Sequence, residues 1–187
     1  IITGFSYSDL DGNTNSGGID LFVIKYNSSG TKQWSKLFGT SSFEGGSGIA
    51  TDSSDNIYLT GNTEGGLDGQ TNSGSNDIYL IKLNSSGTNQ WTKLLGTSGQ
   101  DWGEKVATDS SDNIYVVGTT AGDLDGNTSA GERDIIVAKY YDNGTKDWTK
   151  QLGAYRTENA GDVHVDSSDN MYILGSTDRG EIDSNSS

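Results

Sequence analysis

The chain has 187 residues, with 26 acidic and 12 basic side chains for a formal charge of −14, and it contains no cysteine or proline. This length suits one domain or part of a larger one. The lack of cysteine excludes disulfides, thiolate metal sites and a thiol nucleophile, and the negative charge without any Lys/Arg run makes nucleic acid an unfavourable partner.

The sequence repeats itself with a period of 57 residues. This spacing separates Trp34, Trp91 and Trp148, and it also separates the Asp-Ser-Ser-Asp-Asn runs that start at Asp52, Asp109 and Asp166. The chain therefore holds about 3.3 units, and a period of this length indicates a repeat architecture. The predicted units are a partial one at 1–45, complete ones at 46–102 and 103–160, and a partial one at 161–187.

Each unit contains four short runs that are typical of β-strands. In the unit at 103–160 they are, in chain order, 105–108, 113–119, 134–140 and 145–152. The runs are rich in Val, Ile, Tyr, Thr and Trp, and polar clusters with glycine separate them. None reaches the about ten to twelve residues of a helix, so almost no helix is expected. The sequence predicts an all-β fold of β-propeller blades with four antiparallel strands each, in which the first strand, with its small residues, lies innermost.

The Asp-Ser-Ser-Asp-Asn runs connect the first and second strands of each unit. An aspartate that opens a turn accepts hydrogen bonds from backbone amides two residues on, and Asp or Asn tolerates the left-handed conformation. Asp52 and Asp55 could also form an acid–base pair, but the same pair recurs in every unit, whereas an enzyme needs one site. These runs are therefore predicted to be tight hairpins.

The longest connection, between the second and third strands, contains Leu-Asp-Gly in each unit and precedes another aspartate. Such oxygen-rich side chains are the ligands of calcium, which takes about six to eight of them. The spacing is not that of an EF-hand, and the alternative interpretation is an Asx-type turn that orders the loop. The candidate metal ligands are Asp9, Asp11, Asn13, Asp20, Asp68, Asp77, Asp123, Asp125, Asn127 and Asp134.

Three segments occur in an order that resembles a known family. They are Gly-Ile-Ala-Thr-Asp-Ser-Ser-Asp-Asn-Ile-Tyr-Leu-Thr-Gly at 48–61, Asp-Ile-Tyr-Leu-Ile-Lys-Leu at 77–83 and Gln-Trp-Thr-Lys-Leu-Leu-Gly at 90–96. This order resembles the bacterial β-propeller repeat (SBBP-type) family, which is related to NHL-like propellers. The resemblance implies a propeller in a secreted or surface protein without shared catalytic residues.

The recurring tryptophans resemble the docking motif of quinoprotein propellers, in which the indole packs between adjacent blades. We therefore expect Trp34, Trp91 and Trp148 to pack between blades, with each indole N–H on a backbone acceptor.

A few residues break the repeat and are better candidates for function than the residues that recur. Trp102 has Gly45 and Asn159 at the equivalent positions. It could stack on a sugar ring as a ligand-binding residue, or it could fill a gap between blades. The other residues that occur in one unit alone are Arg133, Tyr155, Arg156 and His164.

Repetition without a unique catalytic cluster favours a non-enzymatic binding or scaffold module with a protein or carbohydrate ligand. The alternatives are a calcium-stabilised structural array of a cell envelope and a polysaccharide-active enzyme fragment. The abundance of Gly, Ser, Asn, Thr and Asp is typical of extracellular or cell-surface proteins, and the apolar runs are too short for membrane insertion.

About three blades are too few for a closed ring. We therefore expect that the chain is an excerpt of a larger propeller, or that copies associate to complete one.

Overall fold

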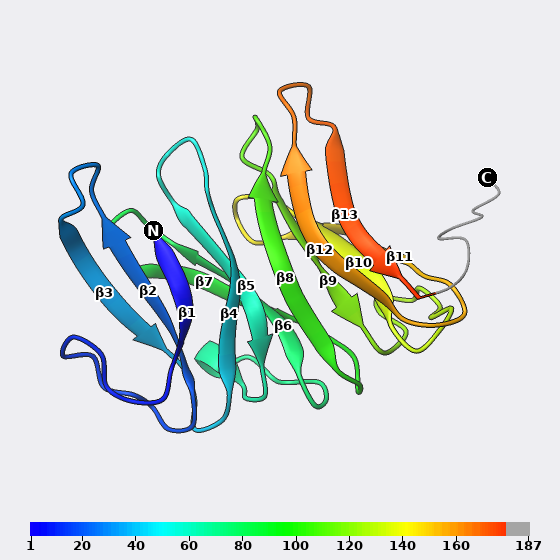
Figure 1. The fold of residues 1–187 in the computed structure, drawn as a ribbon, viewed down its shortest axis with the longest axis horizontal. Coiled ribbons are helices and arrows are strands. Elements are labelled where there is room, and N and C mark those ends of the chain that lie inside the picture. The colour runs from blue at the N-terminus through cyan, green and yellow to red at the C-terminus, as the bar shows by residue number, and fades with distance from the viewer. Residues whose placement is uncertain (179–187) are drawn as a thin grey trace.

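The computed structural model describes residues 1–178, in which four antiparallel sheets are stacked in chain order (Figure 1). The first sheet contains β1 (Ile2–Ser6), β2 (Asp20–Tyr26) and β3 (Lys32–Phe38). The second contains β4 (Glu44–Thr51), β5 (Ile57–Thr63), β6 (Asp77–Leu83) and β7 (Asn89–Leu95). The third contains β8 (Asp101–Thr108), β9 (Ile114–Thr120), β10 (Asp134–Tyr140) and β11 (Lys146–Leu152). The fourth contains β12 (Glu158–Val165) and β13 (Met171–Thr177).

The strand order within the two complete sheets is that of propeller blades, because each strand pairs with the next one along the chain. The ring is not closed, since the stack has two open ends (Figure 1). The predicted all-β propeller fold is therefore confirmed. A single turn of 3-10 helix, η1 (Leu67–Gly69), accounts for the helical conformation in the described residues.

The first strands β4, β8 and β12 lie side by side, and glycines allow their close approach (Figure 1). A Cβ on Gly48 would stand 2.9 Å from the Cα of Lys105 in the next sheet, and one on Gly103 would stand 2.5 Å from Thr60 Oγ1. The small residues that the sequence places in first strands are thus required by the contact between blades.

The hydrophobic core is divided among the three junctions between neighbouring sheets. Alternate residues of β5 point to opposite junctions, so Ile57 and Leu59 pack with Leu21 of the first sheet, whereas Tyr58 packs with Ile114 of the third. Both faces of a central sheet are buried in this way, which explains why β5, β6, β9 and β10 are buried along almost their whole length and do not alternate between buried and exposed residues.

Most predicted strands agree with the structure within one residue, and β8 is the exception. It begins at Asp101, whereas its predicted run begins at Lys105. A β-bulge between Gly103 and Lys105 interrupts its regular pairing with β9. The predicted unit starts at 46, 103 and 161 fall inside β4, β8 and β12, and the last unit is described as far as residue 178.

Neighbouring sheets are joined at their upper end in Figure 1 by recurring residues. The indole N–H of Trp34 donates to the carbonyl oxygen of Ser85 in the next sheet at 3.4 Å, and that of Trp91 donates to Asp142 at 3.1 Å. Each indole lies against a glycine of the next sheet, Gly87 or Gly144, where a Cβ would stand 3.1 Å from the ring. The predicted packing between blades is thus confirmed for Trp34 and Trp91.

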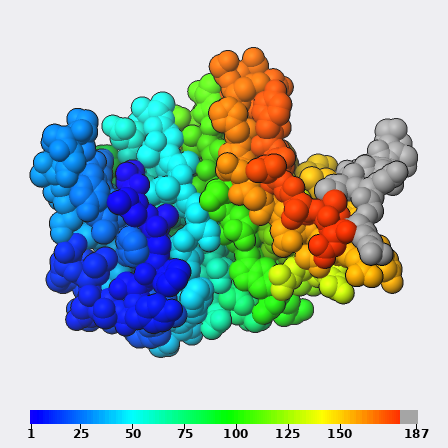
Figure 2. Space-filling view, viewed as in Figure 1, coloured from blue at the N-terminus to red at the C-terminus, as the bar shows by residue number. Residues whose placement is uncertain are grey.

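The Asp-Ser-Ser-Asp-Asn hairpins add a second contact at the upper end. Asp55, Asp112 and Asp169 take the left-handed conformation at φ of about 60°, as the turn prediction requires. The Asp112 carboxylate accepts hydrogen bonds from the backbone N–H and the hydroxyl of Ser53 at 2.9 and 2.6 Å, and Asp169 binds Ser110 in the same way. The space-filling view shows the sheets as adjoining bands whose hairpins separate only at their tips (Figure 2).

Candidate functional site

The Leu-Asp-Gly aspartates lie in tight turns and are held by the outer strand of their own sheet. Asp11, Asp68 and Asp125 have φ of 51°, 51° and 52°. Asp11 forms an ion pair with Lys32 at 2.7 Å, Asp125 binds Lys146, and Asp68 accepts a hydrogen bond from Asn89 at 2.7 Å. The hydrogen bond from Lys32 lowers the pKa of Asp11 below its ordinary value.

The other residues of these loops also make contacts within the loop. Asp9 and Asp123 accept hydrogen bonds from the backbone N–H of Asn15 and Ser129, both at 2.8 Å. The amide groups of Asn13 and Asn127 donate to the carbonyl oxygens of Leu10 and Leu124, at 2.9 and 2.8 Å. Among the described residues, no three His, Cys, Asp or Glu side chains form a group that could hold a metal ion. These contacts are those of the Asx-type interpretation, and calcium binding stays a prediction.

Asp20, Asp77 and Asp134 lie apart from the Leu-Asp-Gly turns, at the starts of β2, β6 and β10, and all three are fully buried. One oxygen of each accepts a backbone N–H hydrogen bond, for example Asp77 from Ser73 at 2.8 Å. The other oxygen has no hydrogen-bond partner among the described residues.

At each junction the next sheet contributes a second buried carboxylate. These carboxylates are Glu44, Asp101 and Glu158, the first residues of β4, β8 and β12. At the second junction, a Cβ on Gly96 would stand 2.3 Å from Asp77 Oδ1 and 3.1 Å from Asp101 Oδ2. Burial raises the pKa of Asp77, and the charge of Asp101 raises it further. Burial also raises the pKa of Asp101. Glycine is needed between the two carboxylates because any side chain would displace them.

The same backbone hydrogen bonds join neighbouring sheets at the lower end of all three junctions. The carbonyl oxygens of Ile19, Asn76 and Arg133 accept the N–H groups of Glu44, Asp101 and Glu158 at 2.7, 2.9 and 2.9 Å. Each contact includes a short parallel bridge, Ile19 with Phe43, Asn76 with Gln100 and Arg133 with Thr157. Each of these contacts uses a short segment that follows β3, β7 or β11. We call these segments the junction loops, and they are residues 41–43, 98–100 and 155–157.

The side chains on the junction loops differ although their backbone bonds recur. The first loop reads Ser-Ser-Phe, the second Ser-Gly-Gln and the third Tyr-Arg-Thr. The third junction thus carries Tyr155, Arg156 and Arg133, which include both arginines of the described residues. Two of the residues that break the repeat therefore lie on one junction loop and a third faces it.

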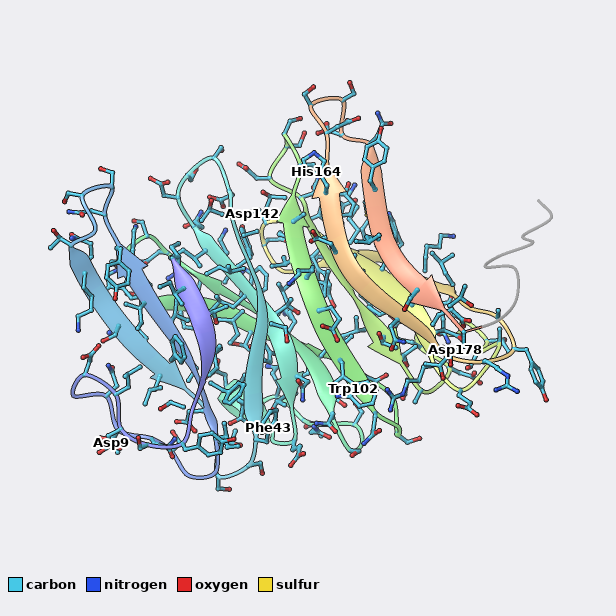
Figure 3. The ribbon with its side chains drawn as sticks, in the orientation of Figure 1. Asp9, Phe43, Trp102, Asp142, His164 and Asp178 are labelled. Carbon is cyan, nitrogen blue, oxygen red and sulfur yellow. The ribbon has the colours of Figure 1, made fainter. Side chains whose placement is uncertain are left out.

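Trp102 belongs to the same region. It is half-buried at the lower end of β8 (Figure 3). The guanidinium of Arg133 lies over its ring at 4.3 Å from the centroid. This distance is that of a cation–π contact. One face of the indole is thereby engaged by Arg133, and sugar binding by Trp102 itself stays a prediction.

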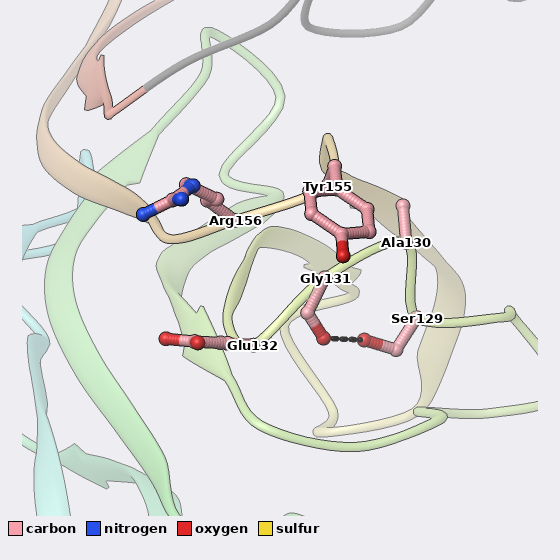
Figure 4. A pocket seen from close by; sticks show the side chains of 6 residues that line it. All are labelled: Ser129, Ala130, Gly131, Glu132, Tyr155 and Arg156. Carbon is pink, nitrogen blue, oxygen red and sulfur yellow. Dashed lines mark hydrogen bonds between the residues drawn. The ribbon is translucent and has the colours of Figure 1, made fainter.

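A pocket of about 460 Å³ opens beside Arg133 and is lined by Ser129, Ala130, Gly131, Glu132, Tyr155 and Arg156 (Figure 4). The Tyr155 side chain is 86% exposed. In Figure 4 the side chains of Arg156 and Glu132 extend to the same side of the loops. Within residues 1–178 neither arginine forms an ion pair. The guanidinium of Arg156 is exposed and can donate hydrogen bonds to a ligand.

Two segments, residues 33–68 and 90–125, match the model of the SBBP β-propeller repeat. The chain therefore contains two repeats of the SBBP β-propeller type. Its curated relatives include the regulatory protein FlaEY of Caulobacter vibrioides, 24% identical over 189 residues, which cover 93% of this chain and 20% of FlaEY. A WD repeat-containing protein, L264, of Acanthamoeba polyphaga mimivirus is 28% identical over 126 residues, 58% of this chain and 9% of L264. The chain therefore spans a small part of the length of these relatives.

The remaining repeat-breaking residue, His164, lies on the open face of the last sheet in this SBBP repeat protein. With Asp162, Val163, Tyr172, Ile173 and Leu174 it lines a second pocket of about 210 Å³. Tyr172 and Leu174 are 57% and 68% exposed, whereas Tyr115 and Val117, one repeat earlier, are buried. No helix in the described residues is long and apolar enough to span a membrane.

The sequence pointed to Trp102, Arg133, Tyr155 and Arg156 only as residues without counterparts in the repeat. It did not indicate that they meet at one junction, and it did not single out Glu132. A comparison of the units position by position could have found Glu132, because Glu132 and Arg156 occupy the positions of Ser75 and Gly99 in the preceding unit.

Proposed function

We propose that this SBBP propeller chain is a non-enzymatic binding module, exposed at the cell surface or outside the cell, that contacts a protein or carbohydrate ligand at its third junction. The observation that carries the proposal is the change from Ser-Gly-Gln to Tyr-Arg-Thr on a junction loop whose backbone bonds do not change. Arg, Tyr and Trp are the residues that most often dominate binding energy at protein interfaces.

The rigidity of the frame supports the same proposal. The loop that carries Tyr155 and Arg156 is held by three backbone hydrogen bonds, from Glu132 and Arg133 to Arg156 and from Asp178 to Thr157. A ligand that binds there loses less of its binding energy to ordering the loop, since the loop is already in place.

The test is an array of purified cell-surface glycans and proteins probed with the wild type and with the Tyr155→Ser/Arg156→Gly variant. This variant gives the third junction loop the first two side chains of the second. We expect ligands bound by the wild type to be lost, while a Ser41→Ala/Ser42→Ala variant at the first junction keeps them. Retention of the same ligands by the third-junction variant would contradict the proposal.

The surface location rests on composition, and it has its own test. Protease treatment of intact cells that express the full-length protein should cleave this chain, whereas an internal control protein should survive. Protection of the chain until the cells are lysed would contradict an exposed location.

The open ends of the stack bear on self-association. Phe5 and Tyr7 are 50% and 72% exposed at one end, and Leu174 is 68% exposed at the other. If the chain is an excerpt of a larger propeller, light scattering should give the mass of a monomer. A stable dimer would favour a ring completed by two chains.

A further inference from the structure

The third junction has a chemistry that narrows the class of ligand, if the binding function proposed above is correct. We propose that it binds an acidic polysaccharide, in which Arg156 contacts a carboxylate on a sugar ring and Tyr155 packs against the ring. The guanidinium has a planar fork of donors that matches a carboxylate in two parallel hydrogen bonds.

The charges of the site favour a ligand with few negative charges. Arg133 and Arg156 are the arginines of the described part of a chain whose formal charge is −14. Glu132 lines the same pocket. Asp178 lies next to the junction loop, since its backbone N–H donates a hydrogen bond to the carbonyl oxygen of Thr157. This surrounding charge repels long polyanions, nucleic acids included, whereas the carboxylate of one sugar ring in a short oligosaccharide can pair with Arg156.

The shape of the site favours sugar rings over an extended peptide. The pocket has about 460 Å³, which lies within the range of small-molecule sites. The exposed ring of Tyr155 offers an apolar face with a hydroxyl at its edge, which suits a sugar ring that is apolar on its face and polar at its rim. Arg133 lies over Trp102, so its guanidinium is oriented before a ligand binds.

The experiment is isothermal titration calorimetry of the chain with digalacturonate and with the same short oligomer fully methyl-esterified, which keeps the rings and removes the charges. We expect the wild type to bind the acid form and to bind the ester at least about tenfold more weakly, the scale of a lost charge-assisted hydrogen bond. Arg156→Ala should weaken binding of the acid form by about tenfold or more, and Arg156→Lys by less.

Two controls keep a loss of binding interpretable. Ser42→Ala, at the equivalent position of the first junction, should leave the affinity unchanged, and each variant should melt at the wild-type temperature. If binding of the array ligands depends on Tyr155 and Arg156, but the chain binds the ester as tightly as the acid, the carboxylate inference is overturned. The proposed function would still stand. Binding of neither oligomer, with peptide ligands on the array, would overturn the polysaccharide inference alone.

Discussion

At the upper end of the sheet stack, neighbouring blades are held together by side chains that recur every 57 residues, such as Trp34 on Gly87 and Trp91 on Gly144. At the lower end the blades are joined by recurring backbone hydrogen bonds, and the side chains on the junction loops change from one junction to the next. Side-chain contacts require identical residues in each unit, whereas backbone bonds tolerate almost any residue. The junction loops are therefore the places where a unit can vary without loss of the fold.

The largest expected difference between the two ends is in the stability lost when a tryptophan is replaced by alanine. Trp91 packs on Tyr58 at 6.1 Å between ring centroids and donates its N–H to Asp142 of the next blade. Trp91→Ala should lower the free energy of unfolding by about 3 kcal/mol, because it opens a junction. Trp102→Ala should lower it by about 1 kcal/mol, since its contact with Arg133 lies at the lower edge. Urea unfolding measures both, and equal losses would remove the distinction between the two ends.

The contributions of aspartates to the free energy of unfolding should change with pH in opposite directions at the two ends. At the upper end, Asp109 is partly buried, but hydrogen bonds from Asn113, Ser111 and Tyr115 hold its pKa below the ordinary value. Its contribution is present above about pH 3.9, the ordinary value, and is lost as pH falls through the lowered pKa. Asp109→Ala should cost about 1 kcal/mol at neutral pH and progressively less in acid.

At the lower end, burial raises the pKa of Asp77. A raised pKa means that the folded state favours the proton, so the contribution of Asp77 is present below about pH 3.9 and is lost as pH rises through the raised pKa. Asp77→Asn should therefore be more stable than the wild type at neutral pH by about 1 kcal/mol, the scale of one unsatisfied buried group. Unfolding curves across this pH range should show the gain vanish in acid, and a gain that does not change with pH would contradict this account.

Exchange of side chains between junctions should have a small effect on stability. Tyr155→Ser/Arg156→Gly leaves the backbone bonds of the third junction loop in place and removes exposed side chains. The free energy of unfolding should change by less than about 0.5 kcal/mol, which is typical of exposed positions. A loss of several times this size would show that these side chains hold the junction together, as Trp91 does at the upper end.

The smallest expected effect is that of calcium. Asp11, Asp68 and Asp125 already have Lys, Asn or Thr partners on the outer strands. Millimolar calcium should therefore change the melting temperature by less than about 1 °C, whereas tight binding to the folded state would raise it. A large rise that disappears when the three aspartates are changed to alanine would identify the Leu-Asp-Gly loops as metal sites and favour a calcium-stabilised array.

Much of the fold could be read from local pattern. The hairpins at 52–56 and 109–113 were predictable because an aspartate that caps its own turn needs only neighbouring residues. The start of β8 was not, since Asp101, Trp102, Gly103 and Glu104 carry no strand pattern. Their extended conformation comes from pairing with β9 and from the bond between Asp101 N–H and Asn76 in the preceding blade.

Trp102, Arg133, Tyr155 and Arg156 of the candidate site were predictable as residues that break the repeat, but Glu132 and the arrangement of the site were not. Trp102 and Arg133 are 31 residues apart, and Arg156 is farther along, so no window of sequence contains their contact. Asp77 shows the same limit. Its spacing from Leu67-Asp68-Gly69 suggested one metal loop, but the structure places it, fully buried, beside Asp101 of the next blade.

The sequence by itself determined the 57-residue unit, its four strands, its turns and the docking tryptophans, because each depends on periodicity or on residues close together in the chain. Only the tertiary structure decided which carboxylates face each other and which singular side chains share a pocket. Those contacts form across junctions, where the stacking of one blade on the next sets the distances.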